Sequence, residues 1–186
     1  MNILDDLPEL ETERLLLRKI TSADTADIFS YSSNENVSKY VTWGKHQSIE
    51  DTEKFIDFIL KGYEYFNKAL WGIVLKDTGQ LIGTIDFVSM NKNHQSAEIG
   101  YVLSEPFWGK GITTEAAKRI IEFGFTELEL ERIQARCIAE NTGSHKVMEK
   151  SGMTYEGTMR KGFLSDGRFH DLKFFSILRE EQKRTR

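Results

Sequence analysis

A glycine-containing segment near the middle of the chain carries the residue types best suited to chemistry. It runs from Glu98 to Gly109, Lys110 and Gly111, and leads into a helical pattern that includes Glu115. Glycine lacks a Cβ, so the backbone can turn sharply there and present successive N–H groups to one anion. The dipole of the following helix adds roughly half a positive charge, and the lysine side chain adds a full one. The pattern predicts a phosphate-binding loop.

The spacing of these glycines disfavours two common nucleotide motifs. A Walker A loop needs four residues between its first glycine and Gly-Lys, and a dinucleotide-binding loop has the form G-x-G-x-x-G. The segment Gly109 to Gly111 fits neither, which disfavours ATP and NAD as ligands. An isolated G-x-G otherwise makes a tight connection between a strand and a helix, so the neighbouring segments decide between the two interpretations.

The hydrophobic pattern around this loop predicts a mixed α/β domain. Apolar residues recur at three- and four-residue steps where helices are expected, and short apolar runs between turn residues indicate strands. Capping residues and Gly152 set several helix ends. The expected order is strand 14–19, helix 21–31, helix 48–63, strands 71–75, 81–85 and 97–103, helix 114–128, strand 132–138, helix 141–151, and strands 154–159 and 172–178.

Composition restricts the class of protein. The 186 residues, 39% of them hydrophobic, predict a single domain, and the net charge of −4 with both signs interspersed argues against nucleic acid as a partner. The single cysteine, Cys137, cannot form an internal disulfide, and an acidic segment follows Met1. We therefore expect a reducing, cytoplasmic location. No apolar run approaches the roughly 20 residues that span a bilayer, so no membrane contact is expected.

Several short motifs occur together in a fixed order, and as a set they are specific. They are Glu11–Arg18, Ala97–Tyr101, Trp108–Ala116, Asn141–Ser144, Lys150–Met153 and Gly167–Asp171. From about Thr12 to Leu178 the chain resembles the GNAT superfamily of acetyltransferases, most closely the branch of ribosomal-protein N-terminal acetyltransferases. The resemblance implies an α/β fold with a mixed, mostly antiparallel sheet of six or seven strands, splayed at its centre and flanked by about four helices.

The resemblance also implies that acetyl-CoA lies between the two splayed strands. Edge groups of Val102 and Leu103 would pair with the pantetheine amides, and the glycine loop would hold the pyrophosphate. Trp108 stands where the superfamily often has Gln or Arg, and Thr113 where it has Gly or Ala. The implied cofactor-binding residues are Val102, Leu103, Trp108, Gly109, Lys110, Gly111, Ile112, Thr113, Thr114, Asn141 and Ser144.

Acetyl transfer to an amine needs a base, a stabilised oxyanion and a proton for the departing thiolate. Glu98 is the first candidate for the base, although a carboxylate at this position could instead bridge neighbouring groups. A tyrosine common in the superfamily is replaced by Met148. Relatives in this branch often carry a serine where Ser144 stands, so the resemblance implies that Ser144 is the acid; the alternative is an ordinary residue of a helix N-terminus. Tyr101 and Tyr155 are alternative acids, or strand residues of the core.

The acceptor amine remains open in the sequence. The branch indicates a protein N-terminal α-amine, but Phe163 replaces a glutamate that some relatives carry. The alternatives are a small amine, such as an amino acid, polyamine or aminoglycoside, and a catalytically silent acyl-CoA-binding module. No histidine spacing indicates zinc, so no metal is expected, and the chain is expected to be a monomer or homodimer. The aromatic residues Trp43, Trp71 and Phe107 are expected to line the amine pocket or to fill the core.

Overall fold

One mixed sheet organises the residues that this computed structural model describes, which are 6–41, 43–65, 68–165 and 167–182. The strand order is β1-β2-β3-β4-β5-β6-β8-β7, and every neighbouring pair is antiparallel except β5 and β6, which are parallel. The strands are β1 (Leu10–Glu11), β2 (Leu15–Arg18), β3 (Leu70–Leu75), β4 (Leu81–Asn91), β5 (Ser96–Leu103), β6 (Arg132–Ile138), β7 (Thr154–Ser165) and β8 (Arg168–Leu178).

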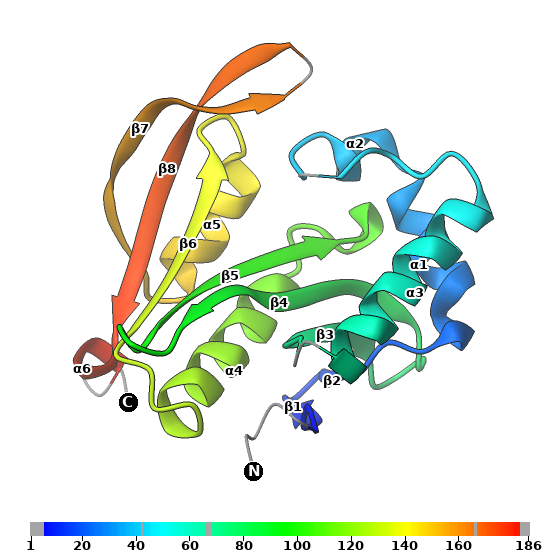
Figure 1. Ribbon diagram of the computed structural model, residues 1–186, viewed down its shortest axis with the longest axis horizontal. Helices are drawn as coiled ribbons and strands as arrows, with labels where there is room; N and C mark the ends of the chain where they lie inside the picture. The colour runs from blue at the N-terminus through cyan, green and yellow to red at the C-terminus, as the bar shows by residue number, and fades with distance from the viewer. Residues whose placement is uncertain (1–5, 42, 66–67, 166, 183–186) are drawn as a thin grey trace.

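Helices cover both faces of the sheet (Figure 1). Apolar residues of α4 and α5 pack on one face in a core that includes Ile85, Ile99 and Ile133. Residues of α1 and α3 pack on the other face against Val74 and Leu81. The helices are α1 (Thr25–Ser32), α2 (Glu35–Ser38), α3 (Ile49–Tyr65), α4 (Ile112–Thr126), α5 (Thr142–Lys150) and α6 (Arg179–Gln182), with 3₁₀ turns η1 (Ser22–Asp24) and η2 (Glu105–Phe107).

The sheet separates at its centre. β5 and β6 pair only from Ser96–Arg132 to Glu98–Gln134, and Figure 1 shows the two strands then diverging, β5 beside β4 and β6 beside β8. The later residues of both strands therefore present free edges to the space between them. The predicted central splay is confirmed.

Trp71 anchors the larger core. Its side chain is fully buried, its ring meets those of Phe87 and Phe123 edge to face at centroid distances of 6.1 and 5.7 Å, and its Nε1 donates to the carbonyl of Pro8 at 2.8 Å. Edge-to-face geometry adds to the burial energy of aromatic rings. Of the two roles considered for this tryptophan, the structure assigns the core.

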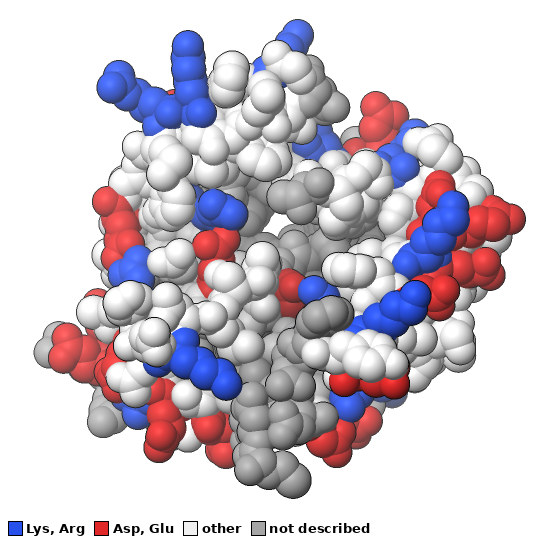
Figure 2. Space-filling model, viewed as in Figure 1, with Lys and Arg blue, Asp and Glu red and all other residues white. Residues whose placement is uncertain are grey.

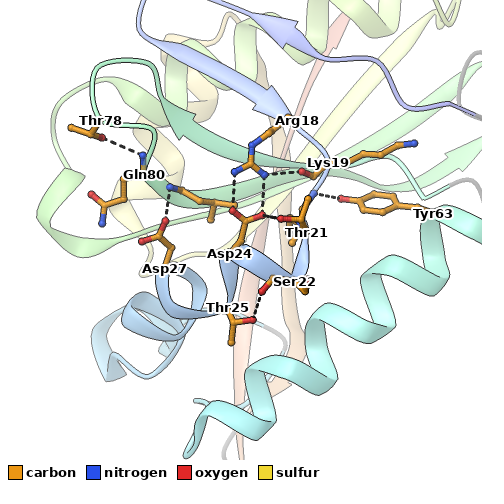
Figure 3. A network of polar contacts seen from close by, with 12 residues as sticks. Arg18, Lys19, Thr21, Ser22, Asp24, Thr25, Asp27, Tyr63, Thr78 and Gln80 are labelled. Carbon is orange, nitrogen blue, oxygen red and sulfur yellow. Dashed lines mark hydrogen bonds and ion pairs between the residues drawn. The ribbon is translucent and has the colours of Figure 1, made fainter.

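An ion-pair network fixes the start of α1 to the sheet (Figure 3). Arg18 on β2 donates two hydrogen bonds to the carboxylate of buried Asp24, at 2.9 and 2.8 Å. The amide of Thr21 donates to the same carboxylate at 2.8 Å. The hydroxyl of Tyr63 on α3 accepts from the amide of Ile20 at 3.1 Å. These contacts hold α1 and α3 in place beside the sheet.

The α/β class is confirmed, but the strand count is corrected from six or seven to the eight found in the described part. The expected strand at 14–19 is preceded by the two-residue strand β1, which pairs with it. The helices α2 and α6 were not predicted because four residues are too few to reveal a helical period. The last two strands form a longer hairpin than expected, with irregular pairing in β7.

Candidate active site

The free edge of β5 forms one wall of the central gap. Residues facing each other across an antiparallel ladder alternate between bonded and non-bonded pairs. The amide of Ser104 bonds to the carbonyl of Ile82 at 2.8 Å, and Val102 lies opposite Thr84 in the same register. The alternation therefore directs the main-chain groups of Val102 to β4 and those of Leu103 to the gap. Of these two predicted residues, Leu103 is the one whose main-chain groups face the gap, and the pairing of either residue with a ligand stays a prediction.

The glycine loop lies where β5 leads into α4. Gly109 and Gly111 have φ of 73° and 75°, left-handed values that favour glycine. Gly111 is the N-cap of α4 and supplies no side chain to cap it, so the amides of the first helical turn remain available for an anion. The indole of Trp108 donates to the carbonyl of Leu103 at 2.8 Å and joins the loop to β5. The local geometry thus fits the predicted pyrophosphate site.

The predicted residues after Gly111 occupy the first turn of α4, which begins at Ile112. The side chains of Ile112 and Thr113 are buried, so any contact with a phosphate falls to their amides and to that of Thr114. The ammonium of Lys110 lies 5.3 Å from the centre of the Phe107 ring, and Phe107 itself packs against the core. The cofactor-binding assignments of this loop stay predictions.

The sequence reasoning did not identify Arg14 as part of this site. Its guanidinium donates to the carbonyl of Lys110 at 3.0 Å and to the carboxylate of Glu115 at 2.6 Å, and it lies 3.7 Å from the point that a Cβ on Gly111 would occupy. Arg14 brings a positive charge to the loop and offsets the negative charge of Glu115. The signal was present in the motif Glu11–Arg18, but the contact joins residues about a hundred positions apart.

On the face that carries α4, Tyr101 of β5 meets Ser144 of α5 across the gap. The tyrosine hydroxyl is 2.8 Å from Ser144 Oγ and donates to the Ser144 carbonyl at 3.1 Å. Burial raises the pKa of Tyr101, so its hydroxyl keeps its proton at neutral pH. Asn141 is the N-cap of α5 and accepts from the amide of Ser144 at 3.0 Å. Asn141 therefore caps the helix, and the hydroxyls of Ser144 and Tyr101 are free to act as a pair.

We expect Ser144→Ala and Tyr101→Phe each to lower kcat, by roughly 10²-fold if their hydroxyls deliver the proton to the thiolate. The double variant should lose little more than either single one, because residues that act as a unit are not additive. Steady-state kinetics on the two single variants and the double variant measure this coupling. An unchanged kcat together with a lower Tm would instead assign the pair to stability.

Glu98 lies where the paired part of β5 ends. Its carboxylate is 2.9 Å from Arg136 Nε and accepts from the Gln134 amide at 3.1 Å. Both partners come from β6, so the carboxylate bridges the two strands just below the point where they diverge. This bridge is the structural alternative considered for Glu98, and the catalytic role of Glu98 stays a prediction.

On the opposite face, residues from the segment after α1 lie near β5. Trp43 and His46 line a small cavity with Thr84 and Val102, and His46 Nδ1 lies 2.8 Å from the hydroxyls of both Ser32 and Thr52. Burial lowers the pKa of His46. Space-filling Figure 2 shows a hollow near the middle of the view, where β5 and β6 diverge in Figure 1.

The α2 segment is tied to the strand that lines the gap. Glu105, just beyond β5, accepts hydrogen bonds from the side-chain amides of Asn34 and Asn36 at 2.7 and 2.9 Å. The far hairpin adds less to the site, since the Tyr155 hydroxyl pairs with Thr158 at 2.6 Å instead of entering the gap.

Two negative findings apply to the described residues alone. No cluster of three or more His, Cys, Asp or Glu residues among them could hold a metal ion. None of the helices within those ranges combines the length and the apolar character that crossing a membrane requires.

Comparison with known proteins identifies the family. The model of the acetyltransferase (GNAT) domain matches residues 14–154. A GNAT-family acetyltransferase from Bacillus anthracis is 34% identical, with 93% of this chain and 99% of that one covered and a TM-score of 0.83. The Bacillus subtilis protein named "Putative ribosomal N-acetyltransferase YdaF" is 32% identical over 80% of this chain and 81% of its own.

A likeness in fold extends to a solved complex. The spermidine N-acetyltransferase of Vibrio cholerae, in complex with CoA and spermine, is 24% identical, with 91% of this chain and 98% of that one covered and a TM-score of 0.77. The sheet splayed at its centre and the glycine loop opening α4 agree with the family match over residues 14–154. The chain belongs to the GNAT acetyltransferases and is an N-acetyltransferase.

Proposed function

We propose that this enzyme transfers acetyl from acetyl-CoA to the α-amine of a protein N-terminus, in the manner of the ribosomal-protein acetyltransferases. The donor would lie between β5 and β6, with its pyrophosphate at the amides of Gly111 and the first turn of α4. Its thioester would face the hydroxyls of Tyr101 and Ser144. The chain itself would bind the donor, exclude water and supply the proton for the thiolate.

The state of Glu98 is the observation that supports this acceptor class. The Glu98 carboxylate is held by Arg136 and Gln134, so it is not a free base for a strongly basic amine. At pH 7, deprotonating an α-amine costs only about 1 kcal/mol, whereas deprotonating a lysine-like amine costs about 4.6 kcal/mol. An acceptor that is nearly neutral before it binds places the smaller demand on whichever carboxylate takes its proton. The name of the relative YdaF supports the same class.

The test measures thiol release from acetyl-CoA with four acceptor panels: peptides with a free α-amine, polyamines, free amino acids and aminoglycosides. Each peptide is matched by a copy that is N-acetylated and keeps an internal lysine, and mass spectrometry locates the added acetyl group. We expect turnover with the free peptides and none with the blocked copies. Turnover with the blocked copies, or with small amines alone, would contradict the proposal.

A small-amine acceptor is the second candidate. It is favoured by the likeness in fold to the spermine-bound enzyme and by the net charge of −4, which attracts cationic substrates. Selective turnover of polyamines would assign this function. Because salt screens such attraction, kcat/KM for a polyamine would then fall steeply as ionic strength rises.

A further inference from the structure

A second carboxylate lies on the sheet face that Glu98 occupies. Asp86 of β4 stands directly opposite Gly100 of β5. Side chains alternate along a strand, so Asp86 shares a face with Thr84, which lines the small cavity beneath α1 and α3. By the same alternation, Glu98 and Gly100 share that face of β5. The opposite face carries Tyr101 and the helices α4 and α5.

The carboxylate of Asp86 extends over the strand that borders the gap. A Cβ built on Gly100 would lie 3.2 Å from Asp86 Oδ1 and 2.6 Å from Val88 Cγ2. The glycine therefore leaves the space that the carboxylate occupies. Since the free edge of β5 begins after Glu98, Asp86 lies over β5 at a level where that strand no longer pairs with β6.

Asp86 also differs from Glu98 in its bonding. The Glu98 carboxylate has partners on two side chains, whereas the half-buried carboxylate of Asp86 has no hydrogen bond or ion pair in the part of the chain that the structure describes. Burial raises the pKa of Asp86 to about 6, and the charge of Lys68 opposes that rise. A carboxylate that lacks a partner and is partly withdrawn from water is costly to stability and is typical of functional sites.

The charged and titratable groups around Asp86 come from three elements and from the connection before β3. Lys68 precedes β3, and Tyr63 of α3 interacts with the carboxylate at a distance. Burial raises the pKa of Tyr63, which stays neutral. Glu98 of β5 carries a negative charge that Arg136 of β6 balances. The raised pKa brings proton exchange at Asp86 close to neutral pH.

We propose that Asp86 is the proton acceptor for the incoming amine, reaching over Gly100, and that Glu98 is a positioning residue that holds β5 and β6 together. This inference rests on the proposed acetyl transfer. The bound ammonium gives one proton to the Asp86 carboxylate, which later releases it to water. The neutral nitrogen then forms the C–N bond to the carbonyl carbon, and the C–S bond breaks. The nitrogen loses its second proton as the thiolate gains one, so one proton is released overall.

The test compares Asp86→Asn with the wild type and with Asp77→Asn, a matched change at an exposed site in the turn after β3. We expect Asp86→Asn to lower kcat/KM at pH 7 by roughly 10²- to 10⁴-fold. The Kd for acetyl-CoA should stay unchanged, and Tm should not fall. Wild-type kcat/KM should fall below about pH 6 as Asp86 gains its proton. The variant should lose that limb, and its deficit should shrink as the pH approaches the pKa of the amine.

Distinct results overturn each proposal. If the wild type acetylates no amine of any panel, the proposed function fails. If the wild type is active but Asp86→Asn keeps kcat/KM within threefold and the same pH profile, Asp86 is not the base. A deficit that stays constant with pH and accompanies a lower Tm would assign Asp86 to structure. Asp86→Glu, which keeps the carboxylate, should recover part of the activity and retain the acidic limb.

Discussion

Replacing Gly111 by glutamate is expected to weaken acetyl-CoA binding by at least roughly 10²-fold, which is about 3 kcal/mol. A side chain at φ 75° adopts a left-handed conformation that costs about 1–2 kcal/mol. The new carboxylate would also lie at the positive end of α4, where the phosphates are proposed to bind, and would compete for Arg14. Isothermal titration with acetyl-CoA measures the loss.

The same substitution at Gly79 is the matched control. Gly79 has φ 71° and open space around it, in the turn between β3 and β4, so Gly79→Glu imposes similar strain and the same charge away from the loop. Gly111→Ala separates strain from charge, since alanine adds no carboxylate. Equal affinities for Gly111→Glu and Gly79→Glu would show that phosphates do not bind at this loop.

Replacing Arg18 by methionine should lower the free energy of unfolding by about 3–5 kcal/mol, because the buried carboxylate of Asp24 would lose its partner. A loss near 3 kcal/mol corresponds to a decrease in Tm of roughly 6–12 °C for a chain of this size. Methionine keeps the apolar stem of the side chain and removes the charge. Thermal unfolding followed by circular dichroism measures the change.

Two comparisons and a pH series test the cause. Lys19→Met breaks the exposed pair with Asp6 and should change stability little, whereas Arg18→Met combined with Asp24→Asn should recover part of the loss.

Burial would raise the pKa of Asp24, but the bonds from Arg18 and Thr21 reverse this and hold the pKa below its ordinary value. The pair therefore stabilises wild type above the pKa of the unfolded chain, and that contribution is lost as pH falls through the native pKa. If the free energy of unfolding of Arg18→Met falls with decreasing pH as it does in wild type, a group other than Asp24 causes that pH dependence.

The sequence predicted those features that local chemistry determines. The left-handed backbone at Gly109 and Gly111 favours glycine, so the two glycines mark the turn before α4 in the sequence. The helix was expected from residue 114 and begins at Ile112. The turn at Gly79 likewise placed the hairpin of β3 and β4. The residues implied by the family resemblance lie on β5, on the glycine loop and in the first turns of α4 and α5, and their roles stay predictions.

The sequence could not predict contacts that depend on register between distant strands. Asp86 gains its position only because β4 places it opposite Gly100. Arg136 reaches Glu98 only because β5 and β6 run parallel for a short distance. Neither pairing leaves a periodic signal along the chain. The sequence therefore indicated Glu98 as the base and gave no reason to consider Asp86.

The short junction between β5 and β6 would make the proposed acetyl-CoA donor part of the architecture. Only three residue pairs of β5 and β6 join the two halves of the sheet in the described residues. A ligand that bonds to the free edges of both strands would therefore connect the two halves as an additional strand does. A ligand present at 100 times its Kd adds about 2.7 kcal/mol to folding stability. Starved of acetyl-CoA, the enzyme would open more often and be degraded sooner. Its cellular abundance would then follow the supply of the metabolite that it consumes.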